Sequence, residues 1–344
     1  MSVCVLVPVY RGSATLERAL KSLAEQSFTD FSVFINDDTP PQFEVERHKL
    51  REIISQFESN FPISFRANGE NLGYPRNLMD LVSRTNEEQI FLLAQDDILS
   101  PIALESCVRA LEEFPSAVAV SRPYFWFQEG DESAIRQICS LGGKRPRLVT
   151  DQSPWSEVKR VLIASSQLTG LMYRRSALTE AFRDTVFPAH IYPLAGAMLN
   201  GGVVYLPYAT VAVSVTYSQT RHVKEIYKES PTLAWAELYE AVFGLQGRVQ
   251  IEANGKIDHL GKNFVGLIQI RVYGGVLSFL KEALVMIKLR KMNFLDPRFL
   301  ITFFGLLLLP RHWTALISDG FKRRVVGRSL RSVRLAEFSD RWWK

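Results

Sequence analysis

The sequence predicts an α/β protein in which a mostly parallel sheet is flanked by helices. Short apolar runs alternate with amphipathic segments of helical period over the first 115 residues or so. That alternation is typical of strand–helix–strand units, which pair their strands in parallel. The chain has 344 residues, 47% of them hydrophobic and 22% charged, which fits a soluble protein of one large or two modest domains.

The elements of the first half can be placed one by one. The run "SVCVLVPVY" is rich in valine, as expected of a strand buried on both faces. Leu16, Ala19, Leu20 and Leu23 then share one face of a helix, for which Ser13 is the predicted N-cap. Further strands are predicted over residues 31–36, 63–68 and 89–94, and further helices over residues 44–59 and 76–83 and from Pro101.

The second half carries a different pattern. The stretch "AVAVSRPYFWF" after residue 117 predicts one or two strands. Residues 165–178 bring a glycine and then a helix start, and residues 198–218 read as a helix end followed by strand-like sequence. From about residue 232 the chain is expected to be helical, with apolar blocks between basic residues.

Polar residues stand at the carboxyl ends of three predicted strands. They are Pro8 and Tyr10, then Asp37 and Asp38, then Asp96 and Asp97. In parallel sheets ligands bind beyond this edge, so the three groups are expected to converge on one crevice. Paired carboxylates suit a hard divalent cation that also binds a diphosphate. The alternative interpretations are a helix cap before Pro101 and a turn before Pro40.

Three motifs, taken in order, resemble those of a known family. "VLVPVYRGSATLERALKSLAEQSFTDFSVFINDD", "NLGYPRNL" and "FLLAQDDILSP" are similar to the family-2 glycosyltransferases, inverting enzymes with the GT-A fold. The resemblance is close over residues 1–120 and weakens toward residue 220. It implies a catalytic domain over residues 1–225, with a nucleotide-binding half (1–120) and an acceptor-binding half (121–225), followed by a helical region over residues 226–344.

The resemblance also implies roles for individual residues. Asp38 would read the nucleotide base with Asp37 beside it, and Arg76 would contact the base or the phosphates. Asp96 would lie near the ribose or sugar, and also near the metal (Mn²⁺ or Mg²⁺) that Asp97 would bind. Pro8, Val9 and Tyr10 would line the nucleotide pocket, Arg221 would hold diphosphate oxygens, and His222 would complete the metal shell.

The expected catalytic base is where the sequence departs from the family pattern. The base is usually the aspartate of a Glu-Asp pair about a dozen residues before a strand like "GGVVYLP", but Ala189 and His190 stand there. Three interpretations stay open: His190 is the base, an acid such as Asp184 or Asp151 replaces it, or the chain is a catalytically impaired sugar-nucleotide-binding protein. A nucleotidyltransferase is a further alternative, but "PVYRGSATL" makes a poor phosphate loop.

The charge is distributed unevenly. The net charge is +5, but residues 281–344 carry +9 and the remainder −4. A basic, apolar C-terminal region suits an anionic membrane surface, and no nucleic-acid motif accompanies it. The alternative is a helical subdomain that packs on protein. The residues expected at the membrane are Phe299, Phe303, Phe304, Leu307, Trp313, Lys322, Arg323, Arg324, Arg328, Arg331 and Arg334.

Cysteine use and the chain's start predict a cellular location. Cys4, Cys107 and Cys139 form no paired framework, which fits a reducing compartment. No signal peptide is expected from the first residues, and the apolar run 299–310 is shorter than the ~20 residues of a spanning helix. The sequence therefore predicts a cytoplasmic protein, peripheral on the inner face of the membrane, that uses a nucleotide-diphosphate sugar donor and a lipid-linked or oligosaccharide acceptor.

Overall fold

The computed structural model describes residues 2–321 apart from 129–130, 139, 180–181 and 217–223. These residues form two compact units. The first comprises the described residues up to Asp184 together with Ala189–Val215. The second comprises Thr185–Pro188 and the described residues from Thr216 onward. The predicted boundary at residue 225 and the two halves of the catalytic domain stay predictions.

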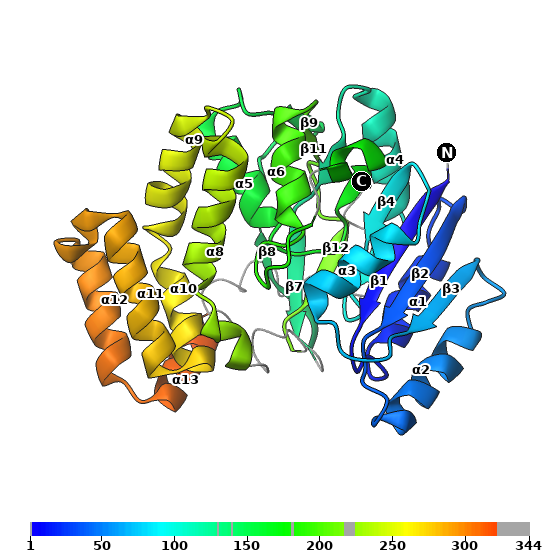
Figure 1. Ribbon diagram of the computed structural model, residues 1–344, viewed down its shortest axis with the longest axis horizontal. Helices are drawn as coiled ribbons and strands as arrows, with labels where there is room; N and C mark the ends of the chain where they lie inside the picture. The colour runs from blue at the N-terminus through cyan, green and yellow to red at the C-terminus, as the bar shows by residue number, and fades with distance from the viewer. Residues whose placement is uncertain (1, 129–130, 139, 180–181, 217–223, 322–344) are drawn as a thin grey trace. The chain divides into compact units, whose positions relative to one another are not determined.

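An eight-stranded sheet forms the first unit, in the order β3-β2-β1-β4-β10-β6-β11-β9. Its first four strands are parallel, with β1 between β2 and β4 (Figure 1). This confirms the predicted α/β fold with a mostly parallel sheet flanked by helices. The elements of this part are β1 (Val3–Val9), α1 (Leu16–Ala24), β2 (Phe31–Asp37), α2 (Glu44–Ser55), β3 (Ile63–Ala67), α3 (Tyr74–Ser83), β4 (Gln89–Leu92) and α4 (Ala103–Glu113).

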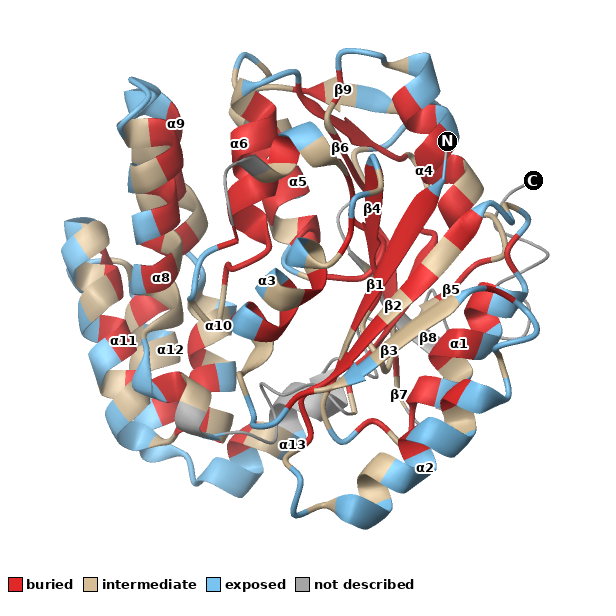
Figure 2. Cartoon of the chain, turned by 45° about the vertical axis from the view of Figure 1, so that its right-hand side comes forward, coloured by how far each residue is buried: buried red, intermediate tan, exposed pale blue. Residues whose placement is uncertain are grey.

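Burial explains the order of these strands. The five residues from Val3 to Val7 are fully buried, as the valine-rich run predicts for a central strand. Figure 2 shows β1 and β4 buried along most of their length, whereas the edge strand β3 is only partly covered. Leu16, Leu20 and Leu23 of α1 belong to the same hydrophobic core, so the predicted helical face is the one that packs.

The rest of the first unit adds antiparallel strands. β10 lies between β4 and β6 and is antiparallel to both, and a second sheet has the order β5-β12-β7-β8. β5 and β10 were not expected, because they have only two and three residues and carry no clear alternation. The elements are β5 (Ile98–Leu99), β6 (Ala119–Ser121), β7 (Tyr124–Gln128), β8 (Asp131–Ile138), β9 (Arg147–Val149), α5 (Trp155–Ala164), β10 (Met172–Arg174), η1 (Arg175–Thr179), α6 (Ile191–Leu199), β11 (Val203–Tyr205) and β12 (Val211–Ser214).

One local prediction was wrong. Thr15, not Ser13, is the N-cap residue of α1, and it makes no side-chain cap. Ser13 instead donates its hydroxyl to Glu46 at 2.7 Å and its backbone N–H to the same carboxylate at 2.8 Å. An N-cap serine would accept from a backbone N–H of the helix. Ser13 instead donates to a carboxylate, and these charge-assisted bonds are the stronger ones.

The second unit is helical. Its core contains Tyr227, Leu267, Phe279 and Phe299 among others. No helix in the described part of the chain is long and apolar enough to cross a membrane. The elements are η2 (Lys224–Lys228), α8 (Pro231–Leu238), η3 (Tyr239–Gly244), α9 (Val249–Asn254), η4 (Gly255–Leu260), α10 (Phe264–Gln269), η5 (Ile270–Gly274), α11 (Val276–Leu289), η6 (Lys291–Phe294), α12 (Pro297–Leu308) and α13 (Arg311–Phe321).

Gly170, which precedes β10, allows a test of this packing. Its φ is +83°, and an added Cβ would lie 2.5 Å from Val211 Cγ2 and 2.6 Å from Arg122 Nε. Gly170→Ala should therefore cost about 3 kcal/mol or more, from backbone strain and overpacking together. Gly142 has φ +74° and open space around it, so Gly142→Ala should cost only about 1 kcal/mol. Equal losses of melting temperature in the two variants would contradict the packing described.

Candidate active site

The carboxyl ends of β1, β2 and β4 lie side by side and are joined by hydrogen bonds. The Asp38 N–H donates to the Val9 carbonyl at 2.7 Å. The Gln95 side chain pairs with the backbone of Tyr10 in both directions, accepting from its N–H at 2.8 Å and donating to its carbonyl at 3.0 Å. The structure thus brings the three predicted groups of polar residues to one edge of the sheet.

Asp38 organises the loop that leads into α3. Its carboxylate accepts from the N–H groups of Leu72 and Gly73, both at 2.8 Å, and from the Asn68 amide at 3.0 Å. The side chain is buried. A carboxylate has about four lone-pair sites, so Asp38 has capacity left for one further donor while it fixes this loop.

Asp37 faces the protein interior. Its Oδ1 accepts from the Thr39 N–H at 2.9 Å, whereas Oδ2 is buried without a hydrogen-bond partner among the described residues. Burial raises the pKa of Asp37, which the bonds from Thr39 and the charge of Arg47 oppose. Asp37 lies beside Asp38, but its side chain is fully buried and accepts from the backbone of Thr39.

Asp96 and Asp97 diverge. Asp97 is 3% exposed, accepts from the Ser214 N–H at 2.9 Å and accepts from the Thr169 hydroxyl at 2.5 Å. Asp96 is half-buried, and its carbonyl accepts from Arg18 at 2.7 Å. Because both oxygens of the buried Asp97 already have donors, the geometry disfavours Asp97 as the carboxylate that reaches a metal. The assignment of the metal to Asp97 stays a prediction, and this arrangement speaks against it.

A buried arginine that sequence reasoning missed lies near Asp97. Arg122 is fully buried and donates to the carbonyls of Ala164 at 3.1 Å, Gln167 at 3.0 Å and Thr169. Burial raises the pKa of Asp97 to about 8, the charge of Asp96 adds to this, and the bonds from Thr169 and Ser214 and the charge of Arg122 oppose it. The signal was present in the sequence, as a charged residue within the strand-like "AVAVSRPYFWF".

His190 is the N-cap residue of α6, and its ring is held on both sides. Ser165 O can only accept, so His190 Nε2 carries the proton and donates to it at 2.9 Å. Nδ1 must then accept from the Tyr74 hydroxyl, which lies 2.6 Å away. Burial lowers the pKa of His190 to about 4. An acceptor substrate could reach His190 Nδ1 only if Tyr74 moved aside, so its predicted role as base stays untested and is disfavoured by this geometry.

Two other predicted residues bind each other. Arg76 Nε and Asp184 Oδ2 are 2.8 Å apart, and both side chains are at least half exposed. Asp151, the other acid considered as base, accepts from the side chain of Gln152 at 3.0 Å. Pro8, Val9 and Tyr10 lie at the end of β1 as expected, with Pro8 and Tyr10 half-buried and Val9 in the core. Arg221 and His222 lie outside the described residues.

A second cation at this edge was also missed. Arg11, directly after Tyr10, has an exposed side chain whose guanidinium lies 3.7 Å from the centre of the Phe43 ring. Its φ is +49°, and its N–H donates to the Thr39 hydroxyl at 2.8 Å. A left-handed arginine is uncommon, and here it turns the chain at the strand end and places an exposed cation at this edge of the sheet.

The described residues contain no cluster of three or more His, Cys, Asp or Glu side chains that could hold a metal ion by themselves. Of the two predicted carboxylate ligands, Asp97 is buried and Asp96 is half-buried. Oxygen ligands from a bound substrate would have to complete the coordination of a hard cation. Among the described residues, the carboxylates at this edge would hold a metal only together with oxygens of a bound diphosphate.

Comparison with known proteins assigns this site to a family. A family model described as glycosyl transferase family 2 matches residues 4–178. The chain belongs to glycosyl transferase family 2. The match spans β1 to η1 and includes every element that builds the strand-end site except α6 and β12.

Solved structures show the same fold. The crystal structure of S. aureus TarS 1-349 has a TM-score of 0.59 and 15% sequence identity, over 93% of this chain and 92% of that one. Its complex with UDP-GlcNAc gives a TM-score of 0.58 at 15% identity and the same coverage. No curated protein matches the sequence. These likenesses confirm the GT-A type of fold predicted from the motifs.

The raised pKa of Asp97 has a consequence for stability. The folded state holds a proton that the unfolded chain releases near pH 4, so this contribution is complete below pH 4 and is lost as the pH rises to about 8. Asp97→Asn cannot ionise. Its melting temperature relative to wild type should therefore rise between pH 5 and pH 8, by at least about 3 °C. The control Glu113→Gln, at an exposed position, should show no such trend, and a pH-independent difference for Asp97→Asn would contradict the assignment.

The hydrogen bonds of His190 lead to a spectroscopic prediction. With its pKa lowered to about 4, the ring should stay neutral between pH 5 and pH 8 and keep its proton on Nε2. NMR of ring-labelled histidine can follow this, with the His190 resonance assigned by its loss in His190→Gln. A midpoint near pH 6.5 for that resonance would show that the ring is accessible to solvent.

Proposed function

We propose that this enzyme transfers a single sugar, with inversion, from a nucleotide-diphosphate sugar to a glycan acceptor in cell-surface polysaccharide synthesis. The observation that carries the proposal is the meeting of Asp38, Asp96 and the end of β1 at one sheet edge in a family-2 chain. Complexes of the similar TarS structure with UDP-GlcNAc and with UDP support a nucleotide-sugar donor. The acceptor would be lipid-linked or an oligosaccharide.

The nucleotide would bind between the loop held by Asp38 and the end of β1. Asp38 would accept one further hydrogen bond, from the base, while it keeps the loop before α3 in place. Arg11 and Arg76 are exposed cations near this edge that would attract the diphosphate. Tyr10 would stack on or beside the base, as aromatic side chains at strand ends can do.

A divalent cation, Mn²⁺ or Mg²⁺, would be held by Asp96 together with oxygens of the donor diphosphate. When bound, it would supply positive charge to the departing diphosphate. His222 stays a predicted ligand beyond the described residues. Asp97 would serve this site by fixing the loop that carries Asp96, through its bonds to Thr169 and Ser214.

The acceptor hydroxyl must lose a proton as the sugar is transferred. Asp184 is the better candidate for this role than His190, because its carboxylate is exposed whereas the His190 ring is enclosed by Tyr74 and Ser165. The ion pair with Arg76 would hold the Asp184 carboxylate in position until the substrates bind. Arg76 would then be shared between the carboxylate and the donor.

A specific observation favours a second candidate, a sugar-nucleotide-binding protein impaired in catalysis. The family's Glu-Asp pair is replaced by Ala189 and His190, and both are buried. A buried neutral imidazole with a lowered pKa is a weak replacement for an exposed carboxylate.

Nucleotide binding and donor hydrolysis, measured separately, distinguish the two candidates. Calorimetry with a panel of UDP- and GDP-sugars and Mn²⁺ should reveal one donor that binds. Chelation of the Mn²⁺ should weaken the binding of that donor. Asp96→Asn should weaken donor affinity at least tenfold, while the exposed control Glu113→Gln changes nothing. Asp184→Asn should keep donor affinity and lower turnover about 100-fold. Donor binding with no turnover in the wild type would favour the impaired candidate, and no binding of any nucleotide sugar would overturn the proposal.

A further inference from the structure

The helical unit exposes an unusual share of apolar side chains. Of the 20 large hydrophobic residues that are exposed in the described part of the chain, 18 lie between Leu233 and Leu316. Only Val45 and Met79 belong to the first unit. Scattered apolar side chains need no explanation, but a concentration of this kind in one unit marks an interaction surface.

The concentration is greatest on α12, which has two apolar faces. Phe299 and Leu306 face inward and belong to the core of the unit. On the opposite side Ile301, Phe304 and Leu308 are 74%, 53% and 80% exposed. An ordinary surface helix is polar on its solvent side. The outward residues of α12 and its continuation, Ile301, Phe304, Leu307, Leu308 and Leu309, are here called the apolar face.

Basic residues flank this face in the sequence. Between residues 288 and 311 the chain has five basic residues and one acid, Asp296. Arg290 pairs with Asp296 at 2.8 Å, so the other four basic side chains set the local charge. They are Lys288, Lys291, Arg298 and Arg311. An apolar face flanked by basic residues complements an anionic lipid surface better than it complements a second copy of itself, which would bring like charges together.

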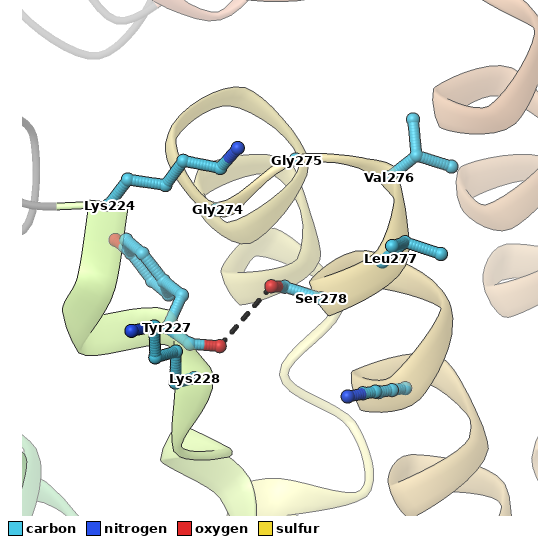
Figure 3. A pocket seen from close by; sticks show the side chains of 9 residues that line it. Lys224, Tyr227, Lys228, Gly274, Gly275, Val276, Leu277 and Ser278 are labelled. Atoms are coloured by element: carbon cyan, nitrogen blue, oxygen red, sulfur yellow. Dashed lines mark hydrogen bonds between the residues drawn. The ribbon is translucent and has the colours of Figure 1, made fainter.

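A pocket lined by lysines lies in the same unit. It encloses about 460 Å³ and is bordered by Lys224, Lys228 and Lys281 together with residues 274–278 (Figure 3). The described residues that line it include no acidic side chain. A Cβ on Gly275 would lie 4.0 Å from Lys224 Nζ, so this ammonium group lies at the N-terminus of α11. Cations gathered at the positive end of a helix repel one another unless an anion lies between them.

The pocket and the apolar face lie at the same end of the unit. Arg271, in η5 just before Gly274, donates to the carbonyls of Leu306 at 2.9 Å and Leu309 at 3.3 Å. This ties the C-terminal end of α12 to the segment that forms the pocket wall. Val276 and Leu277, which line the pocket, are themselves exposed. A phosphate in the pocket would therefore have apolar side chains next to it.

We propose that the helical unit docks on an anionic phospholipid surface, with the apolar face in the interface and the lysine pocket taking the phosphate of one headgroup. This rests on the proposed function in one respect, since a lipid-linked acceptor would be met at that surface. The docking site itself uses none of the residues assigned to donor binding.

Vesicle sedimentation tests the proposal with the full chain. Vesicles of phosphatidylcholine with 30 to 40% phosphatidylglycerol should bind the protein, and vesicles of phosphatidylcholine alone should not. Each lysine near an anionic surface strengthens binding about fivefold, so the triple variant Lys224→Ala, Lys228→Ala, Lys281→Ala should lose on the order of 100-fold. A charge-matched triple variant in the first unit, Lys21→Ala, Lys49→Ala, Lys144→Ala, should lose less than threefold. Equal losses of vesicle affinity in the two triple variants would overturn the assignment of the pocket as the phosphate site.

The apolar face needs its own variant. Ile301→Gln with Phe304→Gln should weaken vesicle binding at least tenfold, whereas Val45→Gln, at an equally exposed position, should not. Sedimentation velocity without vesicles should show a monomer for the wild type. Self-association that the double variant abolishes would overturn lipid docking in favour of a second copy. Thermal stabilisation by inorganic phosphate without vesicle binding would show that the pocket binds free phosphate. That result would also overturn lipid docking.

The two proposals fail separately. Donor affinity and hydrolysis are measured without vesicles, and the pocket variants should leave both unchanged. A chain that binds its donor but ignores anionic vesicles overturns the docking proposal alone. A chain that binds vesicles through the pocket but no nucleotide sugar overturns the proposed function alone.

Discussion

The first unit depends on the buried carboxylate of Asp97. Its two oxygens bind Thr169 and Ser214, which are 72 and 117 residues away in the chain. Arg122 fixes the carbonyls of residues 164–169 from behind. A buried carboxyl group needs hydrogen-bond partners of this kind, because leaving its polar atoms unsatisfied would cost about 1–3 kcal/mol. These bonds tie the loop that carries Asp96 to two segments far away in the chain.

Hydrogen bonds between distant segments also fix the other strand ends. Asp38 fixes the loop before α3, Gln95 joins β1 to the loop after β4, and Tyr74 joins α3 to the start of α6 through His190. Each bond links segments far apart in sequence at one edge of the sheet. Preorganisation of this kind is what a transferase needs, since polar groups that are already oriented need not reorganise when charge develops. The helical unit, by contrast, exposes apolar side chains that nothing in its own described part covers.

The sequence predicted the parallel half of the fold because its strands and helices have strong periodicities. Val3–Val9 and the Leu16 to Leu23 face are examples, and the strand-end acids followed from them. Antiparallel β10 and β5 could not be predicted from the sequence, because segments of two or three residues show no periodicity and pair only through tertiary context. The inward direction of Asp97 also depends on Thr169 and Ser214, which no local pattern connects to it. The family resemblance placed Ala189 and His190 at the position of the expected catalytic pair, but only coordinates could show that the His190 ring is enclosed.

In the proposed function Asp96 faces the substrates, while Asp97 holds the loop from inside through Thr169 and Ser214. The most direct measurement is a crystal structure with a nucleoside diphosphate and Mn²⁺ bound. It should show the Asp96 carboxylate toward the metal and diphosphate, with Asp97 still bonded to Thr169 and Ser214. A structure in which Asp97 has left those partners to bind the metal would contradict the account.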